Sequence, residues 1–272
     1  MSRKITDTVS PAGRIKKMIL QRIRYKKGYD KCIMIMGCQR SGTTLISHLF
    51  NQLEYCSVFG EFSILSNKDS SGLRLNDTAE IINIFERSHA PLIVCKPLVE
   101  SQNANLLLEN IPNSKVLWVY RNYRDVVASD IKKFKETAGR GNILPLINND
   151  QSNWRCEHSS DETRHIIKSL YSDKLSSADC AALFWYARNV LFFEQGFDKN
   201  SSAYLWNYEN FISSPTVIFN DLLDDLQLDK PTKNIHSDVF DDSVNKASNL
   251  TLHKDVEALC DALYQKLNTA EM

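Results

Sequence analysis

Residues 32–50 read CIMIMGCQRSGTTLISHLF. The apolar run CIMIM predicts a short buried strand, GCQRSGTT predicts a tight loop, and LISHLF predicts a helix. Gly37 and Gly42 have the spacing of the phosphate-binding loop G-x-x-x-x-G-K-[ST], in which backbone N–H groups at the start of a helix hold a phosphate. The stretch therefore predicts an anion-binding turn between a strand and a helix. The alternative is a glycine turn with ordinary surface bases.

Three later apolar runs predict further buried strands: PLIVC (91–95), KVLWVY (115–120) and SAYLWNY (202–208). Segments with the apolar spacing of helices alternate with them, at 76–87, 105–110, 121–134, 177–194, 214–228 and 253–268. This alternation predicts an α/β fold, a three-layer sandwich with a central parallel sheet and helices on both faces, similar to P-loop nucleotide hydrolases.

Residues 31–272 are predicted to form a single domain. Residues 136–165 are polar and without a clear period, so we expect irregular structure there. The wider segment 136–176 is predicted to be an insertion, and a mobile substrate lid is the hypothesis for it. For the helix 177–194, Ser177 or Asp179 is the expected cap.

The chain has 272 residues, and its 33 Lys and Arg balance its 33 Asp and Glu. The charge is unevenly distributed, because residues 1–31 carry ten basic and two acidic side chains, a net +8, which leaves −8 for residues 32–272. This distribution disfavours a broad nucleic-acid surface on the main domain. No run of about 18 apolar residues predicts a membrane span.

Residues 1–30 are predicted to form a basic N-terminal helical extension. Within 14–27 (RIKKMILQRIRYKK), the residues Ile15, Met18, Ile19 and Ile23 have helical spacing among basic side chains. The favoured interpretation is an amphipathic helix whose apolar side packs on the domain. The alternative is peripheral contact with an anionic membrane or another partner.

Seven cysteines, an odd number without a C-x-x-C pair, indicate buried thiols in a reducing compartment. The first residues lack the apolar core of a signal peptide. We therefore expect a cytoplasmic protein. Cys156, His158 and His165 do not have the spacing of a zinc site, so they are interpreted as solvated loop residues and no metal is expected.

A positive side chain comes shortly after each of three predicted strands. These are Arg40 in the loop after 32–36, Lys96 after 91–95 and Arg121 after 115–120. The carboxyl ends of parallel strands meet at the ligand edge of an open sheet, so these cations are expected to lie together. Thr43 stands at the lysine position of the nucleoside triphosphatase motif, and no Asp follows a strand to hold Mg²⁺. The sequence therefore favours a protein that neutralises a phosphorylated ligand with its own side chains over a Mg²⁺-dependent nucleotide kinase or NTPase.

Two segments resemble the sulfotransferases that use 3′-phosphoadenosine-5′-phosphosulfate (PAPS). RSGTTL (40–45) is similar to their 5′-phosphosulfate loop, and VYRNYRDVVAS (119–129) is similar to their 3′-phosphate motif. A weaker similarity extends to WNYENFISSP (206–215). The loop and the pair Gly60-Glu61 resemble the tyrosylprotein and bacterial branches most. Since the sequence contains no anchor, we expect a bacterial cytoplasmic enzyme and not a Golgi-resident one. Tyr123 departs from the pattern, because the family often has Pro there.

The resemblance implies a transfer of a sulfuryl group from PAPS to a hydroxyl or amine of an acceptor, in line and without a metal. Arg40, with the amides of Ser41, Gly42, Thr43 and Thr44 and the hydroxyls of Thr43 and Thr44, would hold the 5′-phosphate. Arg121 and Ser129 would hold the 3′-phosphate. The remaining candidates for donor binding are Lys133 on the same helix face as Ser129, Tyr208 beside the adenine and, as a weak candidate, Lys246.

Glu61 is the candidate general base, and His48 and His89 are its rivals. Lys96 is the candidate electrostatic catalyst for the leaving phosphate, with a structural salt bridge as the alternative. Arg124 and Asp125 are interpreted as a local structural pair. The acceptor class stays open among carbohydrate, lipid, peptide and small metabolite, as does a non-catalytic nucleotide-binding role.

Overall fold

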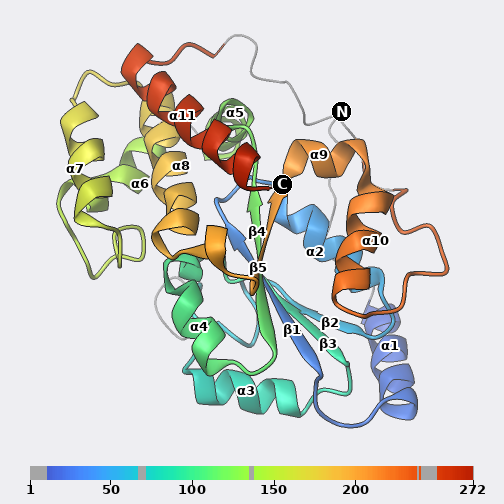
Figure 1. Ribbon diagram of the computed structural model, residues 1–272. Helices are drawn as coiled ribbons and strands as arrows, with labels where there is room; N and C mark the ends of the chain where they lie inside the picture. The colour runs from blue at the N-terminus through green and yellow to red at the C-terminus, as the bar shows by residue number, and fades with distance from the viewer. Residues whose placement is uncertain (1–10, 67–71, 135–137, 238, 240–249, 272) are drawn as a thin grey trace.

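The computed structural model describes residues 11–66, 72–134, 138–237, 239 and 250–271 (Figure 1). Within them, five strands form one parallel sheet in the order β2-β3-β1-β4-β5. They are β1 (Lys31–Gly37), β2 (Cys56–Phe59), β3 (Leu92–Cys95), β4 (Ser114–Tyr120) and β5 (Ala203–Asn207). Ile33 of β1 lies opposite both Val94 and Lys115, which fixes the register of the three central strands.

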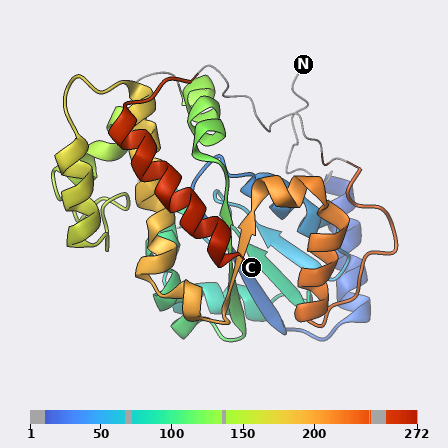
Figure 2. The ribbon, with the colours of Figure 1, turned by 45° about the horizontal axis from the view of Figure 1, so that its top comes forward.

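Apolar residues on both faces of the sheet explain why it is covered on both sides. Met34 and Trp118 belong to one buried cluster, and their neighbours Ile33 and Leu117 belong to the other. Helices of the first side are α3 (Thr78–Glu86), α4 (Ala104–Asn110), α5 (Tyr123–Phe134), α6 (Ala138–Ile147), α7 (Asp161–Leu170), α8 (Ser177–Glu194) and α11 (Lys254–Ala270). Those of the second are α2 (Thr43–Gln52), α9 (Tyr208–Ser213) and α10 (Pro215–Asp225) (Figure 2). The predicted three-layer α/β fold is confirmed.

Helix α8 is the most buried helix of the first side and has the bounds that the sequence predicts. Its cap is Ser176, one residue before the expected position. The Ser176 hydroxyl accepts from the Asp179 amide, and the Asp179 carboxylate accepts from the Ser176 amide at 2.9 Å. This reciprocal pair is a capping box, so Asp179 contributes to the helix start without being the cap itself.

Several elements were not predicted, among them β2, α6 and the start of α7. The edge strand β2 has only four residues and only Cys56 is fully buried, so it lacks the apolar run that marks the other strands. Residues 136–165 were expected to be irregular, which is wrong, because α6 and the start of α7 lie there. Cys156 was also expected in a solvated loop but is buried in the core. The lid hypothesis for 136–176 stays a prediction.

Helix α1 (Pro11–Arg24) is oriented opposite to the favoured interpretation. Its inward side is polar: Lys17 Nζ donates to the Asn51 carbonyl at 2.7 Å, and Gln21 Nε2 donates to the carbonyls of Glu54 and Cys56 at 2.8 and 3.1 Å. The apolar residues Ile15, Met18, Ile19 and Ile23 are exposed. The reason is that α1 covers carbonyl groups at the end of α2 and the start of β2, which need hydrogen-bond donors.

A buried polar network supports the 3₁₀ helix η1 (Leu98–Asn103), which follows β3. Arg188 of α8 is 1% exposed and donates to Gln102 Oε1 at 3.0 Å and to the Leu98 carbonyl at 2.8 Å. Burial lowers the pKa of Arg188 to about 10. Ser101 Oγ in turn accepts from the Gly37 amide at 3.1 Å, so η1 connects α8 to the end of β1.

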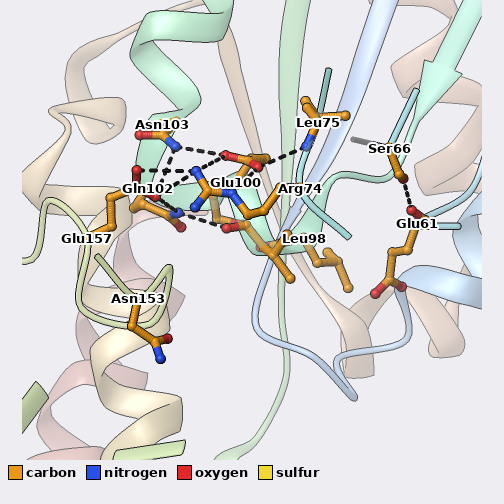
Figure 3. Close-up of polar contacts among 12 residues, drawn as sticks. Glu61, Ser66, Arg74, Leu75, Leu98, Glu100, Gln102, Asn103, Asn153 and Glu157 are labelled. Atoms are coloured by element: carbon orange, nitrogen blue, oxygen red, sulfur yellow. Dashed lines mark hydrogen bonds and ion pairs between the residues drawn. The ribbon is translucent and has the colours of Figure 1, made fainter. Parts of the chain in front are cut away.

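The acidic half of this network lies on the outer side of η1 (Figure 3). Arg74 Nε donates to Glu100 Oε1 at 2.6 Å, and Arg74 Nη2 lies 2.9 Å from Glu157 Oε2. Gln102 Nε2 donates to the same Glu157 oxygen at 2.8 Å. The carboxylates of Glu100 and Glu157 are therefore balanced by the Arg74 guanidinium and by several neutral donors. The buried charge of Arg188 also interacts with both carboxylates.

We expect the substitution Arg188→Met to lower the free energy of unfolding by about 3 kcal/mol, because removing one member of a buried charged network leaves its partners unpaired. The matched control is Arg87→Met on the exposed end of α3, with an expected change within about 0.5 kcal/mol. Urea denaturation of both variants measures the difference. Equal losses would contradict a supporting role for the network.

Candidate active site

Each of the five strands is followed by a candidate residue or segment at the carboxyl edge of the sheet. The glycine loop follows β1, Glu61 follows β2, Lys96 follows β3, Arg121 follows β4, and Tyr208 follows β5. Parallel strands bring these ends to one edge, where open α/β sheets bind their ligands. The sequence shows cations after only three of these strands, because β2 has no clear strand pattern and the residue after β5 is aromatic.

The loop between β1 and α2 depends on two glycines with positive φ. Gly37 has φ 123° and Gly42 has φ 88°. A Cβ atom on Gly42 would lie 2.1 Å from Cδ2 of Tyr208, so the ring requires glycine there. Gly42 is also the N-cap of α2 and provides no side-chain hydrogen bond to the helix. The first amides of α2 are therefore uncapped by a side chain, which suits an anion.

The Ser41 hydroxyl lies within this loop. Its oxygen is buried and has no hydrogen-bond partner among the described residues. Thr43, the next hydroxyl, is 3% exposed. A buried hydroxyl without a partner beside an uncapped helix start is a donor that a bound phosphate oxygen can satisfy.

Arg40 connects the loop to helix α5. Its Nε and Nη2 atoms donate to Ser129 Oγ at 3.0 and 2.9 Å. Burial lowers the pKa of Arg40, whereas the Asp130 carboxylate acts to raise it. Burial raises the pKa of Asp130 in turn, and Arg40 opposes that shift. The two predicted phosphate ligands, Arg40 and Ser129, therefore face the same space although they lie on different motifs.

Arg121 is buried at the end of β4. Its guanidinium carbon lies 4.7 Å from the centre of the Tyr208 ring, and Nη1 donates to the Arg40 carbonyl at 3.3 Å. Asp125 lies 3.5 Å from Nη2 and Glu209 lies 3.8 Å from Nε. Burial raises the pKa of Glu209, while the Asn122 amide and Arg121 act in the opposite direction. Arg121 thus joins the loop, α5 and the start of α9.

Lys96 and Glu61 form the other end of the site. Lys96 is 5% exposed, and its Nζ donates to Thr44 Oγ1 at 2.9 Å and lies 3.1 Å from Glu61 Oε1. The Glu61 backbone carbonyl accepts from the Ser66 hydroxyl, which holds the turn after β2 (Figure 3). One ammonium group therefore lies between the first turn of α2 and the candidate base.

The remaining candidates have no described contact with this centre. His89 precedes β3 and its Nδ1 lies 3.3 Å from the Tyr25 carbonyl, so it is at the amino edge of the sheet and cannot serve the site. His48 lies within α2. Lys133 is exposed on α5, with its ammonium 5.4 Å from the Phe134 ring centre. Lys246 lies outside the described residues.

The expected pair of Arg124 and Asp125 is wrong. Arg124 forms its ion pair with Glu257 of α11, and Asp125 faces Arg121. The two residues are consecutive on a helix and so point in different directions. The Tyr123 hydroxyl donates to Asp261 at 2.7 Å, which anchors the turn where the sequence pattern departs from proline.

Sequence analysis missed two acidic residues of the site, Asp130 and Glu209. Asp130 directly follows Ser129 on α5, and Glu209 directly follows Tyr208 on α9. Their only signal was adjacency to a predicted ligand residue, since no motif calls for an acid beside a phosphate contact. Among the residues that the structure describes, no group of three or more His, Cys, Asp or Glu could hold a metal ion.

The comparisons with known proteins agree with the fold and identify a family. The family model described as "Sulfotransferase domain" matches residues 30–194, more than half of the chain. The sulfotransferase domain of the Synechococcus PCC 7002 olefin synthase is 13% identical, with 89% of this chain and 98% of that chain covered at a TM-score of 0.50. A sulfotransferase from Alicyclobacillus acidocaldarius is also 13% identical, with 89% and 94% covered at 0.48.

The first of these structures supports the fold alone, given its low identity. No curated protein sequence matches the chain. The family model, however, spans the glycine loop, Glu61, Lys96, Arg121 and Ser129. The resemblance carried by RSGTTL and VYRNYRDVVAS is therefore confirmed at the level of the family, and the chain belongs to the sulfotransferase domain family.

Proposed function

We propose that the donor of this sulfotransferase is PAPS and that residues at the carboxyl edge of the sheet bind both of its phosphate groups. The observation that supports this most is the grouping of Arg40, Lys96 and Arg121 around the uncapped start of α2. Three cations and a helix N-terminus match a small ligand with several negative charges. Thr43 at the lysine position gives no support to a triphosphate.

The two phosphates have separate candidate partners. The 5′-phosphosulfate would bind at the amides of residues 41–44, with Arg40 and the hydroxyls of Thr43 and Thr44. The 3′-phosphate would bind Arg121 and Ser129, and Arg40 contacts both of them, through its carbonyl and its guanidinium. The Tyr208 side chain is 5% exposed, and its ring lies between Gly42 and the Arg121 guanidinium. This position favours a role for Tyr208 as one wall of the nucleotide site.

The transfer would proceed by one displacement at sulfur. The acceptor oxygen or nitrogen forms a bond to sulfur while the bond from sulfur to the bridging phosphate oxygen breaks. The electron pair of that bond goes to the departing adenosine 3′,5′-bisphosphate, and the acceptor proton goes to the Glu61 carboxylate. Lys96 and the amides at the start of α2 would stabilise the charge that develops on the phosphate.

The ion pair between Lys96 and Glu61 suggests how donor binding prepares the base. The Lys96 ammonium competes with the acceptor proton for the Glu61 carboxylate at 3.1 Å. A phosphosulfate in the loop would offer the ammonium a second anionic partner near Thr44, which it already contacts. Donor binding would thereby free Glu61 to accept a proton.

The surroundings of Glu61 bear on the acceptor, and the cysteines bear on the location. Phe62 and Ile64 are exposed directly after Glu61, so the face from which an acceptor reaches the base includes apolar side chains.

All seven cysteines are free and buried, which fits the reducing cytoplasm of a bacterium. Among the described residues, no helix is both long and apolar enough to cross a bilayer.

Adenosine 3′,5′-bisphosphate is expected to raise the melting temperature of the protein in buffer containing EDTA, because side chains neutralise its phosphates. Differential scanning fluorimetry at increasing nucleotide concentration measures the shift. No shift at millimolar nucleotide would contradict the donor assignment, as would a shift that appears only with ATP and Mg²⁺.

The substitution Arg121→Ala should weaken binding of this nucleotide by roughly 10- to 100-fold, since it removes a charged hydrogen-bond donor from the proposed 3′-phosphate site. Arg124→Ala is the matched control, because it removes an arginine that pairs with Glu257 of α11 and leaves the proposed 3′-phosphate site intact. Isothermal titration measures both. Ser129→Ala, a smaller change, is expected to weaken binding in the same direction, and wild-type affinity in both variants would exclude this site.

The substitution Glu61→Gln should preserve nucleotide binding and lower turnover by roughly 10²- to 10⁴-fold, the range for loss of a general base. Glu54→Gln, at an exposed ion pair with Arg24, is the control and should turn over normally. Mass spectrometry of sulfated products from labelled PAPS and a cell extract provides the rate. Normal turnover by the Glu61 variant would show that another group takes the proton, and tight nucleotide binding without any product in the wild type would indicate a non-catalytic binder.

A further inference from the structure

The side of helix α1 that faces away from the domain is apolar with a basic border. Ile15, Met18, Ile19 and Ile23 are 60, 54, 53 and 75% exposed. They are four of the ten large apolar residues that are exposed among those described, and they lie on one helix of 14 residues. Ordinary surface helices bury such a stripe, so this exposure indicates a contact that is absent from the isolated chain.

The inward side of α1 is fixed by polar contacts, so the apolar side cannot simply turn inward. Gln21 is 4% exposed and donates to two backbone carbonyls, and Lys17 donates to the Asn51 carbonyl. Arg24 forms an ion pair with Glu54. Burial lowers the pKa of Lys17, which agrees with its inward position. Rotating the helix would break each of these contacts.

The basic residues around the apolar side of α1 indicate what kind of partner it binds. Arg14, Lys16 and Arg22 are exposed on α1, and Lys26 and Lys27 follow it. Residues 1–31 carry +8 and residues 32–272 carry −8. An anionic surface would therefore attract α1 and repel the rest of the molecule, which orients the protein with α1 against it. Two copies joined through α1 would bring two +8 segments together.

We propose that α1 is an interfacial anchor that binds the surface of a membrane containing anionic lipids. The four apolar side chains enter the boundary between headgroups and acyl chains, and the exposed Arg and Lys contact lipid phosphates. The polar inward side of α1 stays attached to α2 and β2, so the whole domain is held at the membrane. This function is independent of the donor and of the base.

The test uses the purified full chain and co-sedimentation with vesicles of phosphatidylcholine, with or without phosphatidylserine. The protein is expected to bind the vesicles that contain phosphatidylserine and to be released by high salt. The triple substitution R14Q, K16Q and R22Q should weaken this binding on the order of 100-fold, as three basic residues near a charged surface are lost.

The apolar part of the anchor is tested by the double substitution I19S and I23S, which should weaken binding about 10-fold or more. The double substitution L106S and V217S changes two similarly exposed apolar residues on α4 and α10 and should bind like the wild type. Circular dichroism checks that all variants are folded. Equal binding to both kinds of vesicle, or wild-type binding by the α1 variants, would overturn the proposal, and so would a stable dimer in solution that the I19S and I23S pair dissociates.

Discussion

The parallel register of β1, β3 and β4 is the constraint on which the candidate site depends. These central strands pair with Ile33 opposite Val94 and Lys115, and they all end at one edge of the sheet. Residues far apart along the chain therefore become neighbours: Arg121 donates to the carbonyl of Arg40, 81 positions earlier, and Lys96 donates to Thr44, 52 positions earlier. Gly37 begins the turn after β1, and its amide is held by Ser101 from the 3₁₀ helix that follows β3. The loop that would bind the donor is positioned by the sheet and by this support.

The cations of the site are balanced by acids of the same molecule. Arg121 faces Asp125 and Glu209, Lys96 pairs with Glu61, and Asp130 acts on Arg40. Three cations therefore lie among four carboxylates at this edge of a segment whose net charge is −8. It also means that a donor must compete with internal carboxylates. The competition costs binding energy, but it keeps buried positive charges paired before the donor arrives.

Sequence patterns predicted the fold class and four strands. Three of these strands, β1, β3 and β4, are apolar runs that are buried almost throughout, and β5 is a run with its second half buried. The patterns did not predict β2, since an edge strand of four residues has little apolar pattern. They also predicted the wrong side of α1 to face the domain. The spacing of Ile15, Met18, Ile19 and Ile23 predicts a helix but does not tell which side faces the domain. That orientation depends on backbone carbonyls of Asn51, Glu54 and Cys56, whose need for donors is a property of the folded chain.

The site residues of the two motifs could be named from the sequence because a strand, a glycine turn and a helix have a short local signature. Their acidic partners and the supporting Arg188 could not, because these contacts join distant segments. The most direct test of the account is a crystal structure with adenosine 3′,5′-bisphosphate. The account predicts the 5′-phosphate at the start of α2 beside Arg40 and the 3′-phosphate on Arg121 and Ser129. A nucleotide bound elsewhere, or in the reverse orientation, would contradict it.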